Sequence, residues 1–252
     1  MATFVLVPGA WIGGWAWRGV AEPLRAEGHE VYPLSLTGMG ERVHLARPET
    51  DLQTHVTDVV NLIEYEDLRD VVLVGHSYGG EPVAGAADRI PDRLSSVVYV
   101  DGGPLPNGMS LLDTWGPEGQ DLVKRRVVEE GEGWRFPLPS WEEFEQTLDA
   151  SLEGLGAEER RLFRGRAVAQ PLATMTQSQQ LGDAAHEALP KVLIACSFSV
   201  AQVEELVRAG HPMFAALGSP QWRFLELPTG HWPMFSRPAD LARLLHEVAT
   251  GA

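Results

Sequence analysis

The pentapeptide Gly75-His76-Ser77-Tyr78-Gly79 places a serine inside a glycine-rich turn. It follows the hydrophobic run 71–74 and precedes a helix-compatible stretch at 81–90. A chain that leaves a buried strand, turns sharply at a strained serine and starts a helix leaves little room for side chains beside the turn. This context predicts a serine nucleophile at Ser77, although a glycine-rich turn can also contain a serine by chance.

A serine nucleophile needs a base, and His231 lies where a base is required. Residues 221–227 have the pattern of a strand, 228–230 that of a turn, and a helix is expected from about Ser236. Such a loop lies at the C-terminal edge of a parallel sheet, where open α/β folds bind their ligands. His231 could take the proton of Ser77 and return it to a leaving group.

The remaining histidines are expected to be surface or structural groups, and they form no recognisable metal-binding set. They are His29, His44, His55, His76, His186, His211 and His246. The sequence therefore predicts neither a metal ion nor another cofactor.

Strands and helices alternate along the chain, which predicts an α/β fold with a mostly parallel, doubly wound sheet of about six strands. A capping box at Thr50 to Gln53 should open one amphipathic helix, and another should lie near the C-terminus. The six expected strands are 3–7, 30–34, 71–75, 94–100, 191–196 and 221–227.

Four motifs together resemble the α/β-hydrolase superfamily: Phe4 to Trp11, Leu36 to Arg42, Val74 to Gly80 and Gly230-His231. More narrowly, the chain resembles the branch of plant methyl esterases, hydroxynitrile lyases and bacterial carboxylesterase relatives. The resemblance spans nearly the whole chain and is weakest between about 112 and 186. It implies the α/β-hydrolase fold, with a helical cap inserted before the last two strands.

The long interval between the fourth and fifth expected strands interrupts the alternation of strands and helices. We therefore expect a single domain with a core at 1–104 and 190–252 and a cap at 105–189 that covers the site. Its aromatic residues Trp115, Trp134 and Trp141 could line an apolar substrate pocket or form the cap's own small core. Trp11 and Trp232 are stronger pocket candidates, since each adjoins a catalytic segment.

The first loop should supply one half of an oxyanion hole. By the family pattern, its donors are the backbone amides of Ala10 and of Tyr78, the residue after the nucleophile. The family usually has His-Gly where this chain has Pro8-Gly9. Proline removes one N–H group and fixes φ, so the loop's shape could change while both proposed donors remain.

A catalytic triad needs an acid beside the serine and the histidine, and here the chain departs from the pattern of the proteins that it resembles. They imply an aspartate shortly after strand 191–195, but this chain has Cys196-Ser197-Phe198-Ser199 there. Asp101 ends the preceding strand, where plant relatives carry a small neutral residue and haloalkane dehalogenases place their acid. We therefore expect Asp101 to orient His231. Asp101 could instead cap the following turn, and Glu204 and Glu205 are weaker candidates because they should lie on a helix.

Composition excludes several classes of partner. The 35 acidic and 20 basic residues give a formal charge of −15, which opposes binding to nucleic acid and to anionic membranes. No apolar run reaches transmembrane length, and the N-terminus has no basic region or cleavage-site pattern. The single cysteine, Cys196, cannot form an internal disulfide. We expect a cytoplasmic enzyme; the sequence does not indicate its oligomeric state.

These features predict a cofactor-independent serine carboxylesterase that cleaves a small or medium-sized apolar ester. Hydroxynitrile lyases use a similar triad, but they typically carry Thr and Lys where this chain has Gly9 and Trp232. A lactone-cleaving or cyclising tailoring enzyme remains an alternative, because fold and triad do not determine the substrate. A non-catalytic ligand-binding relative is a further alternative, since hormone receptors also occur in this superfamily.

Overall fold

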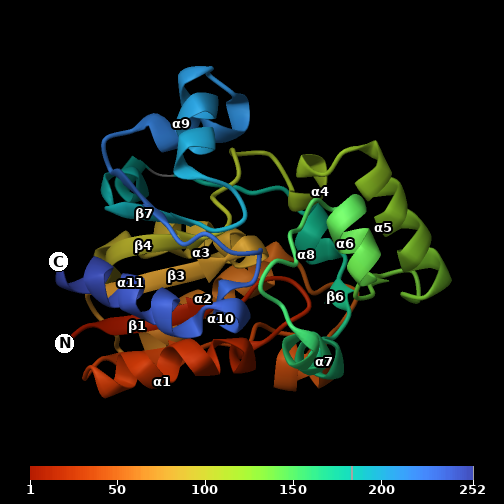
Figure 1. Ribbon diagram of the computed structural model, residues 1–252, viewed down its shortest axis with the longest axis horizontal. Helices are drawn as coiled ribbons and strands as arrows, with labels where there is room; N and C mark the ends of the chain where they lie inside the picture. Colours follow the sequence, from red (N-terminus) through yellow and green to blue (C-terminus); the bar gives the residue numbers. More distant parts are fainter. Residues whose placement is uncertain (183, 252) are drawn as a thin grey trace.

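The core of the molecule is a six-stranded sheet in which each strand runs parallel to its neighbours. The computed structural model describes residues 1–182 and 184–251. Across the sheet the strands follow the order β2-β1-β3-β4-β7-β8 (Figure 1). Their bounds are β1 Thr3–Val7, β2 Glu30–Pro33, β3 Val71–His76, β4 Leu94–Val100, β7 Lys191–Ala195 and β8 Trp222–Glu226.

Helices cover both faces of the sheet. The chain moves from β1 to β2 in one direction and then from β2 past β1 to β3 and β4 in the other. Right-handed crossovers therefore place α1 (Arg18–Ala26) on one face and α2 (Leu52–Tyr65) and α3 (Gly80–Arg89) on the opposite face. α11 (Pro238–Thr250) packs against α1, and α2 packs against α3. The central strands β1 and β3 are consequently buried along almost their whole length.

Most of the segment between β4 and β7, from α4 to α8, forms a separate group of elements beyond the carboxyl ends of the sheet strands (Figure 1). Its only described sheet is the antiparallel pair β5 and β6. Its elements are α4 Leu111–Thr114, α5 Pro117–Glu129, β5 Arg135–Phe136, α6 Trp141–Gln146, α7 Ala157–Arg166, β6 Gln170–Pro171 and α8 Ala173–Thr176.

The remaining helices join or follow the last two strands, together with several short 3₁₀ turns. The α-helices are α9 Val200–Arg208 and α10 Pro233–Ser236. The 3₁₀ helices are Gly14–Trp17, Gly40–Leu45, Ser77–Gly79, Pro91–Arg93, Ala184–Ala188 and Pro212–Gly218.

The fold prediction is confirmed: all six expected strands are present, and their ends differ from the prediction by at most one residue. The predicted capping box is wrong by one position. Asp51, not Thr50, is the N-cap of α2, and its carboxylate accepts the Thr54 N–H at 2.8 Å. The Thr50 hydroxyl instead accepts the N–H of Arg47 in the preceding turn.

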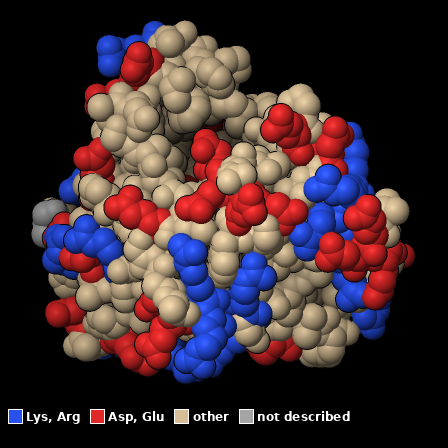
Figure 2. Space-filling view, turned by 45° about the vertical axis from the view of Figure 1, so that its right-hand side comes forward, with Lys and Arg blue, Asp and Glu red and all other residues tan. Residues whose placement is uncertain are grey.

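Charged side chains are unevenly spread over the surface. On the face shown in Figure 2, Asp and Glu side chains border a hollow in the upper part of the molecule, while Lys and Arg side chains gather lower down. None of the helices in the described part of the chain is both long enough and apolar enough to cross a membrane.

Candidate active site

Ser77 lies on a sharp turn between β3 and α3. Its φ is +50°, a left-handed conformation that non-glycine residues rarely adopt. The two flanking glycines are required by space: a Cβ on Gly75 would lie 2.6 Å from the carbonyl oxygen of Gly79, and one on Gly79 would lie 2.7 Å from that of Pro8. The turn therefore holds the Ser77 side chain at the carboxyl edge of the sheet.

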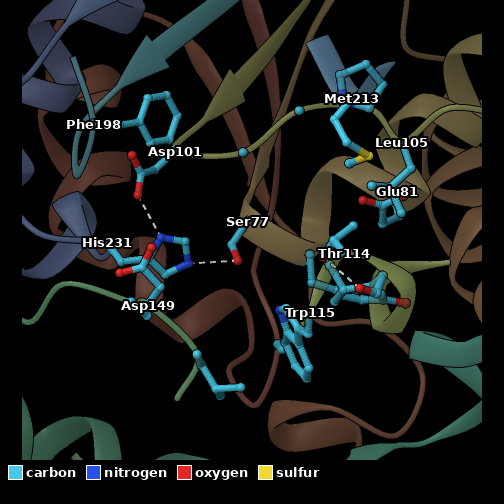
Figure 3. A pocket seen from close by; sticks show the side chains of 18 of the residues that line it. Ser77, Glu81, Asp101, Leu105, Thr114, Trp115, Asp149, Phe198, Met213 and His231 are labelled. Atoms are coloured by element: carbon cyan, nitrogen blue, oxygen red, sulfur yellow. Dashed lines mark hydrogen bonds and ion pairs between the residues drawn. The ribbon is translucent and has the colours of Figure 1, made fainter. Parts of the chain in front are cut away.

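His231 reaches Ser77 from the loop that follows β8. Its Nε2 lies 2.8 Å from the Ser77 Oγ (Figure 3). The loop is fastened from two directions. The His231 N–H donates to the carbonyl of Ser151 at 2.8 Å, and the His231 carbonyl lies 2.7 Å from Nε2 of the buried His76. These contacts fix the position of the imidazole.

Asp101 completes a hydrogen-bonded row with the other two side chains. Its Oδ2 lies 2.7 Å from Nδ1 of His231, and the residue is only 3% exposed. Burial alone would raise the pKa of Asp101. The hydrogen bond and charge of His231, with the hydrogen bonds from Ser197, hold that pKa below its usual value. The carboxylate is therefore charged at neutral pH.

The end of β7, where the resembling proteins carry their acid, instead donates hydrogen bonds to Asp101. The N–H groups of Cys196 and Ser197 donate to Oδ1 at 2.9 and 2.8 Å, and the Ser197 hydroxyl donates to Oδ2 at 2.6 Å. Ser199 caps α9, and Glu204 and Glu205 are exposed on that helix. Among these acidic candidates, the structure brings only Asp101 to His231.

The first loop passes beside the nucleophile turn, and both Ala10 and Tyr78 line the same cavity as Ser77. Trp11 has a φ of +63°. The segment that precedes β7 holds Trp11 in place through hydrogen bonds. The Trp11 N–H donates to Oε1 of the fully buried Gln170 at 3.1 Å, and its indole N–H donates to the carbonyl of Phe136 at 3.2 Å. Val168 donates its N–H to the Trp11 carbonyl at 2.9 Å.

Two other histidines near the site are buried in structural positions. His55 lies 2.7 Å from the Tyr78 hydroxyl and 2.8 Å from the Thr37 carbonyl, and burial lowers its pKa to about 4. Burial and the neighbouring His231 lower the pKa of His76 to about 3. Both imidazoles are therefore neutral at pH 7, as expected for structural groups.

A cavity of about 290 Å³ opens in front of Ser77. Most of its wall is apolar and comes from both the sheet side and the segment after β4. Three of the residues that were predicted to line a substrate pocket, Trp11, Trp115 and Trp232, line this cavity. Further apolar residues in the wall are Leu105, Leu111, Phe144, Leu148, Leu193, Phe198, Met213, Phe214 and Leu217.

Two predicted pocket residues do not line this cavity. Trp141 turns away from it, packs against Phe144 and Phe163 and lies beneath the guanidinium of Arg164, 4.7 Å from the ring centroid. Trp134 instead stacks with the guanidinium of Arg135. Trp141 packs against the hydrophobic core, because aromatic rings are also needed to give the segment after β4 a core, whereas Trp134 is half-buried outside it.

Sequence reasoning missed Glu81, which lines the cavity and is only 3% exposed. It stands one helical turn after Ser77, in the buried and otherwise apolar first half of α3. A single acid in such a helix is the signal that could have identified it. In the described part of the chain, no group of three or more His, Cys, Asp or Glu side chains is arranged to hold a metal ion.

Both the sequence and the fold are similar to those of known proteins. Residues 4–244 match the family model described as alpha/beta hydrolase family. The chain is 35% identical to the carbendazim hydrolyzing esterase of Nocardioides sp. (strain SG-4G), over 97% of this chain and 98% of that protein. It is 27% identical to methylesterase 3 of Arabidopsis thaliana, over 97% and 95% respectively. A solved extracellular α/β-hydrolase from a Paenibacillus species superposes with a TM-score of 0.79 at 24% identity, covering 98% of both chains.

Proposed function

The chain belongs to the α/β-hydrolase family, as an esterase-type member, and we propose that it is a serine carboxylesterase for small or medium-sized apolar esters. The hydrogen-bonded row from Asp101 through His231 to Ser77 is the observation that carries the proposal. The similarity to a carbendazim hydrolyzing esterase and to plant methylesterases supports ester hydrolysis. The largely apolar wall of the cavity supports an apolar substrate.

In the proposed first half-reaction, the Ser77 Oγ attacks the ester carbonyl while Nε2 of His231 takes the hydroxyl proton. The charged Asp101 accepts a hydrogen bond from Nδ1, which keeps Nε2 free as the base and stabilises the imidazolium. The amides of Ala10 and Tyr78 donate to the negative oxygen of the tetrahedral intermediate. When the carbon–oxygen bond to the alcohol breaks, His231 returns the proton to the leaving oxygen.

Water completes the proposed cycle. His231 takes a proton from a water molecule whose oxygen attacks the acyl carbon, and the bond between that carbon and the Ser77 Oγ then breaks. The proton on Nε2 returns to Ser77, and the carboxylic acid leaves. Every proton moves between substrate, water and named side chains, so the reaction balances without a redox partner.

We also propose that the chain forms a single domain with a core at 1–104 and 190–252 and a cap at 105–189. The position of α4 to α8 beyond the strand ends supports this division (Figure 1). The cap contributes Trp115, Phe144 and Leu148 to the cavity wall. A cytoplasmic location is likewise a proposal, supported by a lone cysteine that is buried and unpaired.

A fluorophosphonate probe followed by a substrate panel tests the proposed function. We expect the wild type to be labelled on Ser77 and to hydrolyse simple esters in preference to lactones and cyanohydrins. Ser77→Ala should abolish labelling and lower kcat by about four orders of magnitude or more, because triad residues act as a unit. Its thermal unfolding should remain cooperative. Retention of more than about a tenth of the wild-type kcat would contradict the proposal.

A further inference from the structure

Glu81 is a buried acidic group of the cavity for which the proposed hydrolysis gives no role. It lies in the first turn of α3 and contributes to the same cavity wall as Ser77. Figure 3 shows its side chain on the far side of Ser77 from His231, near Leu105 and Met213. The carboxyl group is therefore separate from the Asp101–His231–Ser77 row and faces a different part of the substrate.

No protein partner in the described part of the chain explains the burial of the Glu81 Oε2 atom. This oxygen is buried and has no hydrogen bond to any described residue. Gln179 approaches from the cap, but its side-chain amide donates to the backbone carbonyl of Glu81, at 3.3 Å, and not to the carboxyl group. Burial raises the pKa of Glu81 well above its usual range, which favours the neutral, protonated form of the group.

An unpaired buried acid destabilises a fold, and this position does not require one. A carboxyl group without hydrogen bonds loses its hydration on folding and gains nothing in exchange. Glutamine or methionine has a similar shape and would suit the same helix at a lower cost. Costly groups of this kind are typical of binding sites, where the missing partner comes from the ligand.

The charges around the cavity favour a positively charged partner. Glu81, Asp101 and Asp149 all line it, whereas no Lys or Arg is found among its described lining residues. The formal charge of the whole chain, −15, acts in the same direction. A cationic group that leaves water for this cavity therefore meets a negative potential and an acid that is able to give up its proton.

The geometry of the proposed hydrolysis decides which part of the substrate meets Glu81. His231 must give its proton to the leaving alcohol, so the alcohol lies on the His231 side of Ser77. The acyl group then extends away from His231, toward the side of the cavity where Figure 3 places Glu81. The leaving alcohol and Glu81 consequently contact opposite ends of the ester.

We propose that Glu81 binds a basic nitrogen in the acyl part of the substrate, and that the preferred substrates are esters with an amine-bearing acyl group. This inference rests on the proposed esterase function. A neutral amine takes the O–H proton of Glu81 on its lone pair, whereas an amine that arrives as ammonium binds after the Glu81 proton has passed to water. In both cases an ammonium–carboxylate pair forms inside the cavity. A charge-assisted pair of this type is stronger than a hydrogen bond between neutral groups.

Two pairs of matched esters test the inference. Methyl 4-(aminomethyl)benzoate and methyl 4-ethylbenzoate have the same shape but only the first has a basic nitrogen, and the 3-substituted isomers form the second pair. The measured quantity is the ratio of kcat/KM for the amine to that for the ethyl ester. We expect the wild type to favour the amine in at least one pair, and Glu81→Gln to lower that ratio by about tenfold or more.

Asp149→Asn is the matched control, because Asp149 is another carboxylate of the cavity wall but is exposed. It should lower the ratio less than Glu81→Gln does, since water screens an exposed charge. Thermal unfolding should show Glu81→Gln to be at least as stable as the wild type. Glu81→Met provides a second neutral variant should Glu81→Gln fail to fold.

The two proposals fail in different ways. Without Ser77 labelling and without hydrolysis of either ester, the esterase function itself is wrong. Hydrolysis of the ethyl esters with the same ratio in the wild type and in Glu81→Gln would overturn only the role of Glu81. A parallel loss of activity toward both esters, or an equal change of the ratio in Asp149→Asn, would overturn it as well, because Glu81 would then be structural or would act only through general charge.

Discussion

The two sides of the cavity are built on different principles. On the sheet side, Ser77, Asp101 and His231 follow three strand ends, and their positions are set by backbone turns and parallel strand pairing. On the cap side, Trp115, Phe144 and Leu148 come from short helices and loops, and their positions depend on how side chains pack. Backbone rules can be recognised in a sequence, whereas side-chain packing emerges only from the whole fold.

The boundary between these two sides is itself part of the site. The cap accepts hydrogen bonds from Gly230 and His231 through the carbonyls of Glu153 and Ser151, at 3.1 and 2.8 Å. It also holds the first loop, through the contact between Gln170 and the Trp11 N–H. The sheet supplies the reactive side chains, but the loop that carries His231 and the first loop, which carries the Ala10 amide, are both held by hydrogen bonds to the cap.

Among the variants that distinguish the two sides of the cavity, substitution of Asp101 should have the largest effect on activity. Asp101→Asn keeps a side-chain oxygen for the N–H groups of Cys196 and Ser197 but allows the wrong tautomer of His231. We expect kcat for a simple ester to fall by about three to four orders of magnitude with the fold intact. Steady-state kinetics and circular dichroism measure the two quantities.

Ser199→Ala is the control for Asp101→Asn, because it alters the position where the resembling proteins carry their acid. It should change kcat less than about threefold and lower stability by about 1 kcal/mol through loss of the α9 cap. A near-normal kcat for Asp101→Asn would refute the assignment and favour a Ser77–His231 dyad.

A smaller effect is expected at the boundary, where Gln170 positions the first loop without touching the substrate. Gln170→Leu leaves the Trp11 N–H without its acceptor, and the neighbouring Ala10 amide should lose its alignment. We expect kcat to fall by about 10- to 100-fold while KM changes little, because an oxyanion donor acts mainly in the transition state. Initial rates across a range of ester concentrations separate kcat from KM.

Gln177→Leu is the control for Gln170→Leu. It makes the same substitution at a cap residue whose side chain binds α2 instead of the first loop. Its Oε1 accepts the Gln53 N–H at 2.8 Å, and its amide donates to Asp51 at 2.8 Å. This variant should lose stability but keep its kcat. Equal losses of kcat in the two variants would mean that Gln170 matters only for the stability of the cap.

Within the cap, Trp115 and Trp141 should respond differently to substitution, because Trp115 lines the cavity and Trp141 does not. Trp115→Ala enlarges the cavity, so the preference for bulky over small acyl groups should rise by about five- to tenfold. Trp141→Ala should leave that preference unchanged and lower the free energy of unfolding by about 1–3 kcal/mol. A panel of esters of increasing size and a urea titration test the pair, and a changed size profile in Trp141→Ala would contradict the structure.

The last prediction concerns the stability of the fold in acid, and it should affect activity at neutral pH least of all. The pKa of His55 is lowered to about 4, so the unfolded chain binds a proton there at a higher pH than the folded chain does. The free energy of unfolding should therefore fall as the pH drops from about 6.5 toward 4, by on the order of 1–3 kcal/mol. Urea titrations at several pH values measure this slope.

His55→Gln should flatten that slope, although it also costs stability at pH 7 through the contact with Tyr78. His44→Gln, at an exposed position, is the matched control and should leave the slope unchanged. An unaltered slope in His55→Gln would assign the acid sensitivity to other groups, with the buried His76 as the first alternative.

The contrast between backbone rules on the sheet side and side-chain packing on the cap side explains what could be predicted from the sequence. Gly75 and Gly79 are required by local space, so the turn around Ser77 is visible in five residues. The position of Asp101 could be inferred because parallel strands end at one edge, where β4 and β7 are neighbours. Trp134 and Trp141 have the residue type of a pocket wall, but nothing local to them tells which way their rings will pack. Glu81 was missed because a carboxylate on a helix is ordinarily solvent-exposed.

The left-handed backbone at Trp11, Ser77 and Asp101 has a consequence for engineering. Each of these residues has a φ between +47° and +63°, in which a side chain costs on the order of 1 kcal/mol and glycine costs almost nothing. A library selected only for heat resistance would therefore be expected to accumulate glycine at position 77, in proteins that are more stable and inactive. Directed evolution of this scaffold has to select for turnover in every round.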